Sequence, residues 1–440
     1  MSEKTTALQD LQKILPHTDI LTQCMHCGMC LATCPTYDLT KLERSSPRGR
    51  IRMIKSVAEG KMEISAQFAE EMSFCLDCQA CETACPAGVQ YGKMVEGARV
   101  AISKTAYGKT IPQLIKKVGL NYILASKTNL KIAARLLWLY QRLGIQKLLH
   151  KLAIFEIFMP KIGRADDLAP TISCTFSESS FQENMTPPKG KKHKVAFLTG
   201  CLMDVAFADI NRDTVEVLLA NGCEVFIPKG QVCCGSLHAH NGEKDKAVEL
   251  AKKNLDAFAT QDYDYLISNS AGCGAFMKHY NELFAEEPEY QKKAAHFSHK
   301  VKDITEFLAE IDLNVEDMGV LNVKATYHDA CHLSHAQKVT SQPRKVLAAI
   351  PGLELVPLDE SLWCCGSAGI YNVMRYDDSM KFLEKKMTNI KKTKAEMVIT
   401  SNPGCLGQIQ YGAKLEGLDI EVVHPATVLH RAYLEKSDKN

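Results

Sequence analysis

The chain has 440 residues, 46% of them hydrophobic and 24% charged, a globular balance that excludes a disordered chain. Its 53 lysines and arginines nearly cancel its 51 aspartates and glutamates, so the net charge of +2 gives no reason to expect a nucleic-acid partner. At roughly 150 residues per domain, the length predicts about three domains.

Of the 18 cysteines, 17 fall into two groups, and Cys174, alone between them in a polar linker, is interpreted as an isolated thiol without a role. Eight lie between Cys24 and Cys85, and nine lie between Cys201 and Cys405. The first ten residues are polar and lack the apolar core of a signal peptide, and no uncharged apolar run approaches the ~20 residues of a membrane span. We therefore expect a cytoplasmic protein, in which clustered cysteines are metal ligands or redox groups rather than disulfides.

Residues 1–105 contain two copies of one cysteine run. Each copy reads C-x2-C-x2-C-x3-C-P, the run of bacterial ferredoxins with two [4Fe-4S] clusters, in which the fourth cysteine binds the other cluster. Two structural zinc sites are the alternative, but zinc favours separated C-x2-C pairs. The predicted ligands are, for cluster I, Cys24, Cys27, Cys30 and Cys85 and, for cluster II, Cys75, Cys78, Cys81 and Cys34.

The interval between the two runs is long for a compact ferredoxin and has room for helices. Ile51 and Ile54 have helical spacing and predict a helix within 49–64, so we expect an α-helical ferredoxin domain. Three arginines here, Arg48, Arg50 and Arg52, stabilise reduced clusters electrostatically, face a partner or belong to a solvated helix face.

Residues 106–193 are expected to form a basic helical region that ends in a polar linker. The stretch 111–164 carries ten lysines and arginines, a single acid and many leucines. A basic amphipathic helix can lie on an anionic membrane, which predicts peripheral membrane contact. The alternative is a helical hairpin packed between the other domains.

From residue 194 the chain repeats itself, with a first copy at 194–312 and a second at 324–435. Each copy alternates strand-like and helix-like stretches, which predicts a duplicated α/β unit. The expected strands are 195–198, 225–228 and 265–268, then 325–327, 353–357 and 397–400. Four cysteines recur at matching places: Cys201, Cys233, Cys234 and Cys273 in the first copy, and Cys331, Cys364, Cys365 and Cys405 in the second.

The spacings of these cysteines are C-x31-CC-x38-C and C-x32-CC-x39-C, each CC pair being followed by glycine. The paired cysteines could ligate a metal, form a vicinal disulfide or remain buried thiols, and their matched repetition disfavours buried thiols. We therefore expect one or two further iron–sulfur clusters here. Nearby histidines, including His328 and His238, would suit zinc or iron, although such histidines more often cap helices or bond to the backbone.

The repeated pattern resembles the cysteine-rich CCG domain of heterodisulfide-reductase-type proteins. Joined to a two-cluster ferredoxin domain, it is similar to the iron–sulfur subunits of bacterial glycolate oxidases, a resemblance that covers nearly the whole chain. The chain departs from heterodisulfide-type sites in one respect. Such sites carry a C-x-x-C at the end of each motif, but the first position of that motif is Ser270 in the first copy and Asn402 in the second. Five-thiolate clusters are thereby disfavoured, while four-thiolate sites remain open. The most similar strings are SPRGRIRMIK at 46–55, SAGCGAFMKHY at 270–280, HLSHAQKV at 332–339 and CCGSAGIY at 364–371.

The resemblance implies an α+β multidomain fold, in which an N-terminal α-helical ferredoxin domain precedes the duplicated α/β CCG domain. It also implies an electron-transfer subunit that serves FAD-containing oxidase subunits, passes electrons to a membrane quinone and lies at the cytoplasmic face of the inner membrane. The sequence has no dinucleotide fingerprint, Walker A run or nucleophile elbow, so we expect no flavin or NAD on this chain and no activity without its partners.

Three other functions remain open at this point. One is the iron–sulfur subunit of a D-lactate or glycerol-3-phosphate dehydrogenase, which would carry similar clusters for a different substrate. Another is a disulfide or heterodisulfide reductase with catalytic CCG cysteines. The last is a zinc-binding assembly scaffold.

Overall fold

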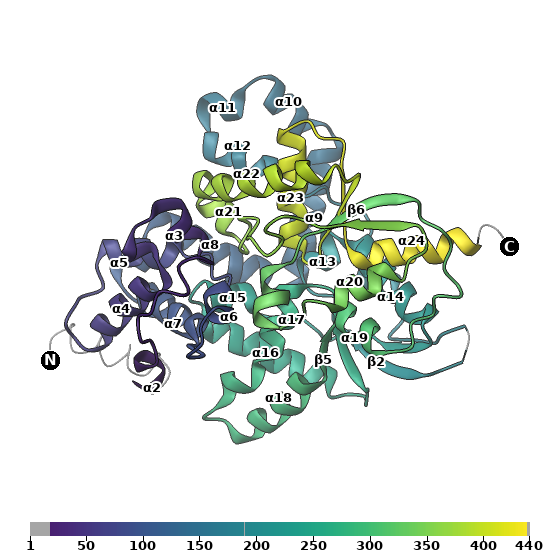
Figure 1. The fold of residues 1–440 in the computed structure, drawn as a ribbon, viewed down its shortest axis with the longest axis horizontal. Coiled ribbons are helices and arrows are strands. Elements are labelled where there is room, and N and C mark those ends of the chain that lie inside the picture. The colour runs from purple at the N-terminus through teal and green to yellow at the C-terminus, as the bar shows by residue number, and fades with distance from the viewer. Residues whose placement is uncertain (1–17, 189, 438–440) are drawn as a thin grey trace.

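The computed structural model describes residues 18–188 and 190–437, so the first ten residues considered above lie outside it. Figure 1 shows a helical N-terminal domain on the left, a helical segment at the top, and two α/β units that fill the centre and the right. This arrangement confirms the predicted fold class. Within the described ranges, no helix has both the length and the apolar composition needed to cross a bilayer.

The N-terminal domain is helical because its apolar residues recur at helical spacing and face one core. Ile54, Met72, Met94 and Val95 are completely buried in that core. The elements are α2 (Thr18–Thr22), α3 (Pro35–Thr40), η1 (Glu43–Ser45), α4 (Pro47–Ala58), α5 (Ala66–Phe74), α6 (Ala80–Thr83) and α7 (Tyr91–Ser103).

Helix α4 is the helix expected within 49–64, and it contains Ile51 and Ile54, whose spacing predicted it. The Ser46 side chain accepts a hydrogen bond from the Gly49 amide and caps its first turn. The helix ends at Ala58 because Gly60 adopts a left-handed conformation, with φ of 72°, and turns the chain away.

The following segment is a series of helices, as expected from its sequence. Helix α9 packs against the first α/β unit through Leu130 and Ala134, which contact Ile172, Phe176 and Val205. The elements are η2 (Ala106–Lys109), α8 (Ile111–Val118), the π-helix η3 (Gly119–Leu124), α9 (Lys127–Arg142), α10 (Ile145–Lys151), α11 (Ile154–Phe158), α12 (Pro160–Asp167) and η4 (Ser177–Ser180).

The first α/β unit has a five-stranded sheet in the order β1-β3-β2-β4-β5, parallel except for β1. Three of the expected strands are present as β2 (His193–Phe197), β3 (Cys223–Phe226) and β4 (Tyr265–Ser268), while β1 (Asn184–Met185) and β5 (Val301–Asp303) were not predicted. Its helices are α13 (Leu202–Val205), α14 (Ala208–Ala220), α15 (Ser236–His240), α16 (Lys244–Phe258), α17 (Ala271–Met277), η5 (Tyr280–Phe284), α18 (Pro288–Lys300) and α19 (Ile304–Glu310).

The second unit repeats this topology in a four-stranded parallel sheet of order β7-β6-β8-β9. The expected strands appear as β6 (Val323–Tyr327), β7 (Leu353–Val356) and β8 (Met397–Ile399), and the sequence again missed the last one, β9 (Glu421–Val423). Its helices are the π-helix η6 (His332–Ala336), α20 (Gln342–Ala348), α21 (Tyr371–Met374), α22 (Tyr376–Thr393), α23 (Pro403–Leu415) and α24 (Pro425–Ser437).

The two units share one apolar core, which is why they pack as paired halves. Val195 and Phe197 of β2 belong to the same buried cluster as Tyr327 of β6 and Leu429 of α24. Because the carboxyl ends of parallel strands lie at one edge of a sheet, each unit gathers the loops that follow its strands. The repeated cysteines lie in or just after those loops, so each sheet brings its own four cysteines together.

Candidate metal centres

The cysteines of the N-terminal domain line two small cavities. One, of about 30 Å³, has Pro86 and Arg48 in its wall and four cysteines of the predicted cluster I set: Cys24, Cys27, Cys30 and Cys85. The other, of about 20 Å³, has Arg50 and Tyr91 in its wall and the predicted cluster II set: Cys34, Cys75, Cys78 and Cys81. The fourth cysteine of each run thus lies with the first three of the other run, and Cys81 also borders the first cavity.

Left-handed residues let the chain wrap around each cavity. In the first run, His26 and Gly28 on either side of Cys27 have φ of 56° and 89°. In the second run, Asp77 and Gln79 take the same positions around Cys78, with φ of 54° and 60°. Three of these four are not glycine, and a left-handed conformation costs such residues of order 1 kcal/mol or more. This repeated cost indicates that the loops are shaped to aim their sulfurs inward.

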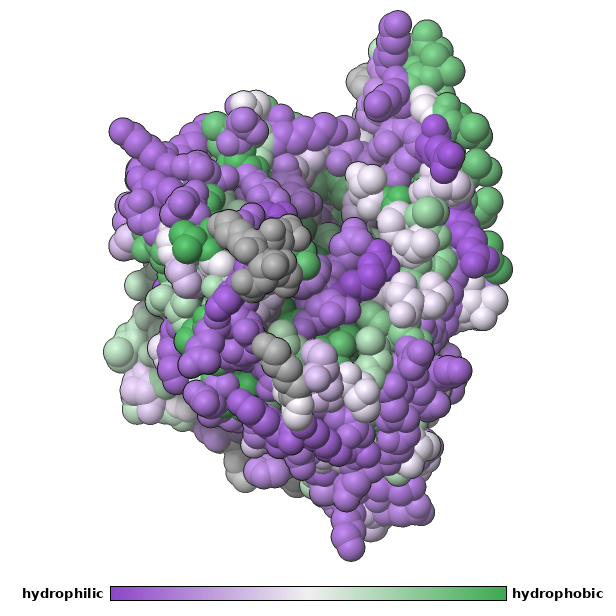
Figure 2. All heavy atoms as spheres, turned by 90° about the vertical axis from the view of Figure 1, so that its right-hand side faces the viewer, coloured by the Kyte–Doolittle hydropathy of each residue, from purple (hydrophilic) through white to green (hydrophobic). Residues whose placement is uncertain are grey.

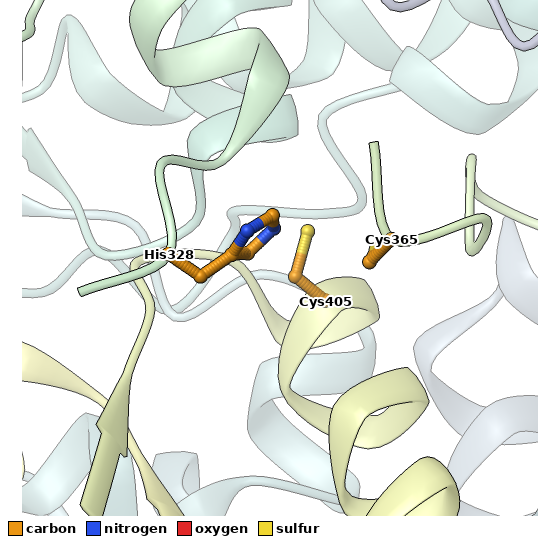
Figure 3. A group of neighbouring side chains, drawn as sticks. All are labelled: His328, Cys365 and Cys405. Carbon is orange, nitrogen blue, oxygen red and sulfur yellow. The ribbon is translucent and has the colours of Figure 1, made fainter. Parts of the chain in front are cut away.

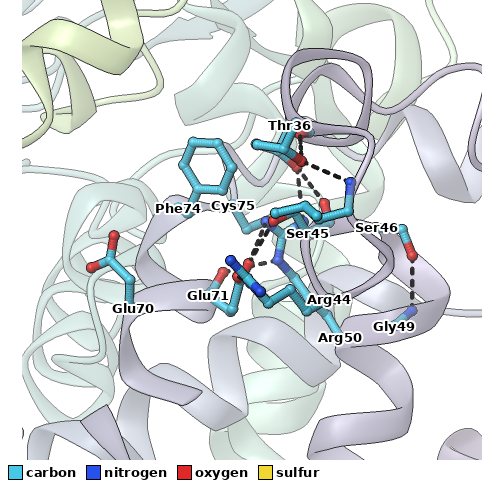
Figure 4. Close-up of polar contacts among 12 residues, drawn as sticks. Thr36, Arg44, Ser45, Ser46, Gly49, Arg50, Glu70, Glu71, Phe74 and Cys75 are labelled. Atoms are coloured by element: carbon cyan, nitrogen blue, oxygen red, sulfur yellow. Dashed lines mark hydrogen bonds and ion pairs between the residues drawn. The ribbon is translucent and has the colours of Figure 1, made fainter. Parts of the chain in front are cut away.

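A buried arginine holds the segments that carry Cys34 and Cys75 (Figure 4). The Arg50 guanidinium, 1% exposed, donates from Nε to the Glu71 carbonyl at 2.8 Å and from Nη1 to Thr36 Oγ1 at 2.9 Å. Its Nη2 lies 3.7 Å from the Glu71 carboxylate. The Thr36 hydroxyl lies 3.3 Å from the Cys34 sulfur. Arg50 is therefore not on a solvated helix face, and its charge lies beside the second cavity.

Opposing electrostatic effects act on the pKa values of the cysteine thiols in this second cavity. Burial raises the pKa of the Cys34 thiol, while the hydrogen bond with Thr36 and the charge of Arg50 lower it. Burial raises the pKa of Cys78 and Cys81 well above the usual range, and neighbouring thiolates raise it further. In the chain without metal these two thiols are protonated, so a bound metal must displace their protons.

The first α/β unit brings its four repeated cysteines into one buried chain of contacts. Cys201 interacts with Cys233, and Cys234 interacts with both Cys233 and Cys273. Hydrogen bonding from Cys201 and Cys234 lowers the pKa of Cys233, and hydrogen bonding from Cys234 and Ser270 lowers that of Cys273. Four sulfurs in contact, two of which favour the thiolate, form a donor set suited to a thiophilic metal.

The second unit repeats these contacts with its own cysteines. Cys331 interacts with Cys364, and Cys365 interacts with Cys364 and Cys405. The Asn402 amide Nδ2 approaches the Cys405 sulfur at 3.6 Å, and its Oδ1 accepts a hydrogen bond from the Gly272 amide at 3.3 Å. Asn402 therefore supplies a hydrogen-bond donor where a C-x-x-C motif would supply a fifth sulfur, and it also connects the two repeated sets.

The second repeated set also adjoins the N-terminal domain. Cys78 and Cys331 pack against one apolar cluster, which contains Leu76 and Cys364. After burial, the charge of Cys331 is the largest influence that raises the pKa of Cys78. The four sets thus follow one another through the molecule, from the first cavity to the second, then to the second repeat and finally to the first repeat.

Two cysteines belong to none of the four sets. Cys174 is exposed in the linker, in agreement with its interpretation as an isolated thiol. Cys223 lies on β3 in the apolar core, where burial raises its pKa to about 12.

The sequence did not single out one buried charge near the second repeated set, Lys386, whose ammonium donates to the carbonyls of Glu360 and Ser361. A lysine within an amphipathic helix gives no local signal that it is buried.

Family models match the N-terminal domain, the helical segment and both α/β units. The model described as a 4Fe-4S dicluster domain matches residues 20–89, and the one described as a cysteine-rich domain matches 195–278 and 325–410. A third, described as the linker region of the glycolate oxidase iron–sulfur subunit, matches 112–169. These matches, together with the cysteine sets, define an iron–sulfur electron-transfer protein with a dicluster domain and two cysteine-rich domains.

Individual relatives identify more narrowly the kind of iron–sulfur protein to which the chain is similar. The probable glycolate oxidase iron–sulfur subunit of Bacillus subtilis is 37% identical over 94% of this chain and 94% of its own length. The glycolate oxidase iron–sulfur subunit of Escherichia coli is 30% identical over 92% of this chain and 93% of its own. The lactate utilization protein A of Shouchella clausii is 38% identical over 54% of this chain and 98% of its own. The chain belongs to the family of glycolate oxidase iron–sulfur subunits, which confirms the resemblance seen in the sequence.

The Arg50 cluster predicts how the N-terminal domain responds to loss of a charge. Glu71→Ala leaves the Arg50 guanidinium buried without its carboxylate, and also removes the partner of Arg44 Nε at 2.9 Å and of Ser45 Oγ at 3.0 Å. We expect a loss of about 3–5 kcal/mol in the free energy of unfolding, measured by urea denaturation of the metal-loaded protein.

The neighbouring residue on α5 provides the control. Glu70 is 58% exposed and pairs with Arg375 at 2.7 Å, so Glu70→Ala should cost less than about 1 kcal/mol. Equal losses for the two variants would contradict a structural role for the Arg50 cluster.

Proposed function

We propose that this chain is the electron-transfer subunit of an oxidase complex that acts on glycolate. FAD-containing partner subunits oxidise the substrate, and this chain conducts the electrons to a membrane quinone at the cytoplasmic face of the inner membrane. The observation that carries the proposal is the uninterrupted succession of four cysteine sets through the molecule. Electron transfer through a protein needs redox centres that adjoin one another, whereas a structural metal site functions without a neighbouring metal site.

The ligand sets follow from the grouping of the sulfurs. In this proposal Cys24, Cys27, Cys30 and Cys85 hold cluster I, and Cys34, Cys75, Cys78 and Cys81 hold cluster II. When bound, [4Fe-4S] clusters accept and release single electrons. The repeated sets offer four sulfurs each and hold one or two further clusters. The domain limits proposed for these parts are 1–105, 106–193, 194–312 and 324–435.

The exposed end of the succession is the proposed docking surface for the flavoprotein. Cys27 is solvent-exposed, whereas Cys75 and Cys81 of the second set are buried. Met25 and Met29, beside Cys27, are 71% and 59% exposed. Flexible, polarisable methionines suit a surface that a partner covers. Electrons would enter this chain at the first set.

A cavity of about 400 Å³ is the proposed position of the acceptor. It lies between the N-terminal domain and both α/β units, and Cys75 of the second set lies in its wall. Its lining combines polar side chains, among them Asp77, Arg99 and His240, with apolar ones such as Leu237, Ile370 and Met374. The volume falls in the range of small-molecule sites, and a lining of both kinds fits a quinone ring with its lipophilic tail.

The projecting helices α10–α12 are the proposed membrane contact. Figure 2 shows hydrophobic side chains along one edge of the projection at the top of the molecule, where Figure 1 places these helices. Leu148, Leu152, Ile157 and Phe158 are exposed there, Phe158 to 74%. Lys147, Lys151 and Lys161 on the same helices are also exposed and would face anionic headgroups. Elsewhere in the segment, Lys127 and Lys131 pair with Glu178, so they are less suited to this contact.

A substrate such as D-lactate is the second candidate, favoured by the 38% identity with a lactate utilization protein. The substrate would bind to the flavoprotein, so both candidates assign the same role to this chain. A disulfide or heterodisulfide reductase is less consistent with the structure, because Ser270 and Asn402 stand where such sites carry a ligating cysteine and hydrogen-bond to the remaining sulfurs.

Metal content tests the assigned ligands. Protein purified without oxygen should contain about eight iron atoms from the N-terminal sets and about four more for each repeated set that binds a cluster. Cys27→Ser should remove about four iron atoms per chain, while Cys174→Ser, at the exposed cysteine outside the sets, should remove none. Stoichiometric zinc in place of iron would overturn the proposal, as would glycolate oxidation by the purified chain without its partners.

The acceptor cavity can be tested in the assembled complex. Ile370→Trp should fill part of the cavity and lower the rate of quinone reduction at least tenfold, while reduction of a water-soluble dye continues. Val373→Trp, on the exposed side of α21, is the control and should change neither rate. If quinone reduction survives Ile370→Trp, the acceptor binds elsewhere.

Membrane contact predicts association with anionic vesicles at low salt and release at high salt, where the Debye length falls to about 3 Å at 1 M. The double variant Ile157→Ser, Phe158→Ser should lose most of this association in vesicle flotation. Leu415→Ser and Leu434→Ser, at exposed apolar residues of α23 and α24, should not affect it. Absence of association by the unaltered protein at low salt would contradict a membrane role for α10–α12.

A further inference from the structure

A histidine lies within the second repeated cysteine set. His328 follows β6 and precedes Cys331 by three residues. A ring nitrogen of His328 and the sulfurs of Cys365 and Cys405 all lie within 4.8 Å of one another. Figure 3 shows the ring directed toward the Cys405 sulfur, with Cys365 beyond it. His328 follows β6, Cys365 lies in the loop between β7 and α21, and Cys405 lies in the first turn of α23, and the three side chains converge on one buried point.

At most one nitrogen of the His328 ring has another polar partner. The residue is 1% exposed, and among the described residues neither Nδ1 nor Nε2 makes a hydrogen bond of normal geometry. The Ser361 carbonyl, which also accepts from Lys386 at 3.2 Å, acts on the ring as a hydrogen-bond acceptor, and it can serve only one of the two ring nitrogens. Burial lowers the pKa of His328 well below the usual range, so the ring is neutral and one nitrogen carries a free lone pair. Leaving a buried polar group without a partner destabilises a fold, and a metal bond to the free ring nitrogen would remove that cost.

Other buried histidines do not share this property. His238 bonds the Leu120 carbonyl at 2.8 Å, His335 bonds Thr83 Oγ1 at 3.0 Å, and His424 Nδ1 accepts from the Ala426 amide at 3.1 Å. Each of these rings has one partner that explains its burial. His328 therefore differs from ordinary core histidines of the same protein.

The first repeat shows that the fold does not require a polar side chain here. The equivalent position, three residues before Cys201, is Leu198, which is buried in an apolar cluster. An apolar side chain thus fills the same place in one copy of the unit, while the other copy carries an imidazole. The difference points to a task that only the second cysteine set performs.

The second set also lacks the cysteine that a C-x-x-C motif would supply, since Asn402 occupies that position. We propose that His328 is a nitrogen ligand of the iron–sulfur centre of the second repeat, bound alongside Cys365 and Cys405. The inference rests on the proposed function, which places a cluster in this repeat.

Ligation by His328 would give this centre a distinct redox property. Imidazole is a common iron ligand, and replacing thiolates with neutral histidines raises the reduction potential of an iron–sulfur cluster. Lys386 acts in the same direction, because its side chain is completely buried near these sulfurs and the Cys365 thiolate favours its charged form against burial. The second repeat would then hold the centre that retains electrons most strongly, next to Cys78 of the preceding set.

Selective isotope labelling of the full chain tests the assignment. The protein is produced with ¹⁵N-histidine, loaded with iron and sulfide without oxygen, and reduced for pulsed electron paramagnetic resonance. We expect a coupling from a directly bound histidine nitrogen, which clusters ligated only by cysteine do not show. His328→Leu, which introduces the residue of the first repeat, should abolish the coupling. His424→Leu, at another completely buried histidine, should retain it.

A second variant covers the case in which His328→Leu does not fold. His328→Cys should retain the iron, lose the histidine coupling and lower the reduction potential of one centre. A coupling that persists in either His328 variant would overturn the inference, as would its absence from unaltered protein that holds twelve or more iron atoms per chain. Unaltered protein that holds only eight iron atoms would instead contradict the cluster in the repeats, and this inference with it.

Discussion

The structure depends on the burial of cysteine sulfurs in contact with one another. Thiolates repel one another, and burial makes each charge more costly, so burial and neighbouring thiolates raise the pKa of Cys78 and Cys81 well above the usual range. Only a positively charged metal core satisfies several such sulfurs at once. The left-handed loop residues lie around these sets and aim the sulfurs inward. The buried Arg50 and Lys386 place positive charge beside them.

The molecule meets this constraint with two different kinds of scaffold. In the N-terminal domain, short loops wrap each cavity, and helices α4 and α5 hold the loops through the Arg50 cluster. In the duplicated unit, parallel sheets collect distant cysteines at the carboxyl ends of their strands. Arg99 joins the two scaffolds, since its guanidinium donates to the carbonyl of Cys75 at 2.6 Å and to that of His240 at 2.9 Å. This packing allows sets on different scaffolds to become neighbours.

Most of the fold could be predicted from the sequence because its signals are local. The helical N-terminal domain, the duplicated unit and six of the strands follow from periodicity and from the offset between the repeats. Strands β1, β5 and β9 have two or three residues each and were missed. The equally short β8 was found because it precedes Cys405, one of the repeated cysteines that align the two copies.

The sequence by itself determined which sulfur donors the chain offers: two ferredoxin runs and two matched sets of four cysteines. The assignment of the first eight to two clusters stays a prediction, and each predicted set lines a cavity of the structure. Ligand spacing within a run is a local property of the chain, so it can be read without a structure. Only the tertiary structure decided which sets adjoin, that Arg50 and Lys386 are buried charges, and that the ring of His328 lies against the sulfurs of Cys365 and Cys405. Burial and contact between residues far apart in sequence depend on how whole elements pack, and a residue's own neighbours in the chain carry no record of that packing.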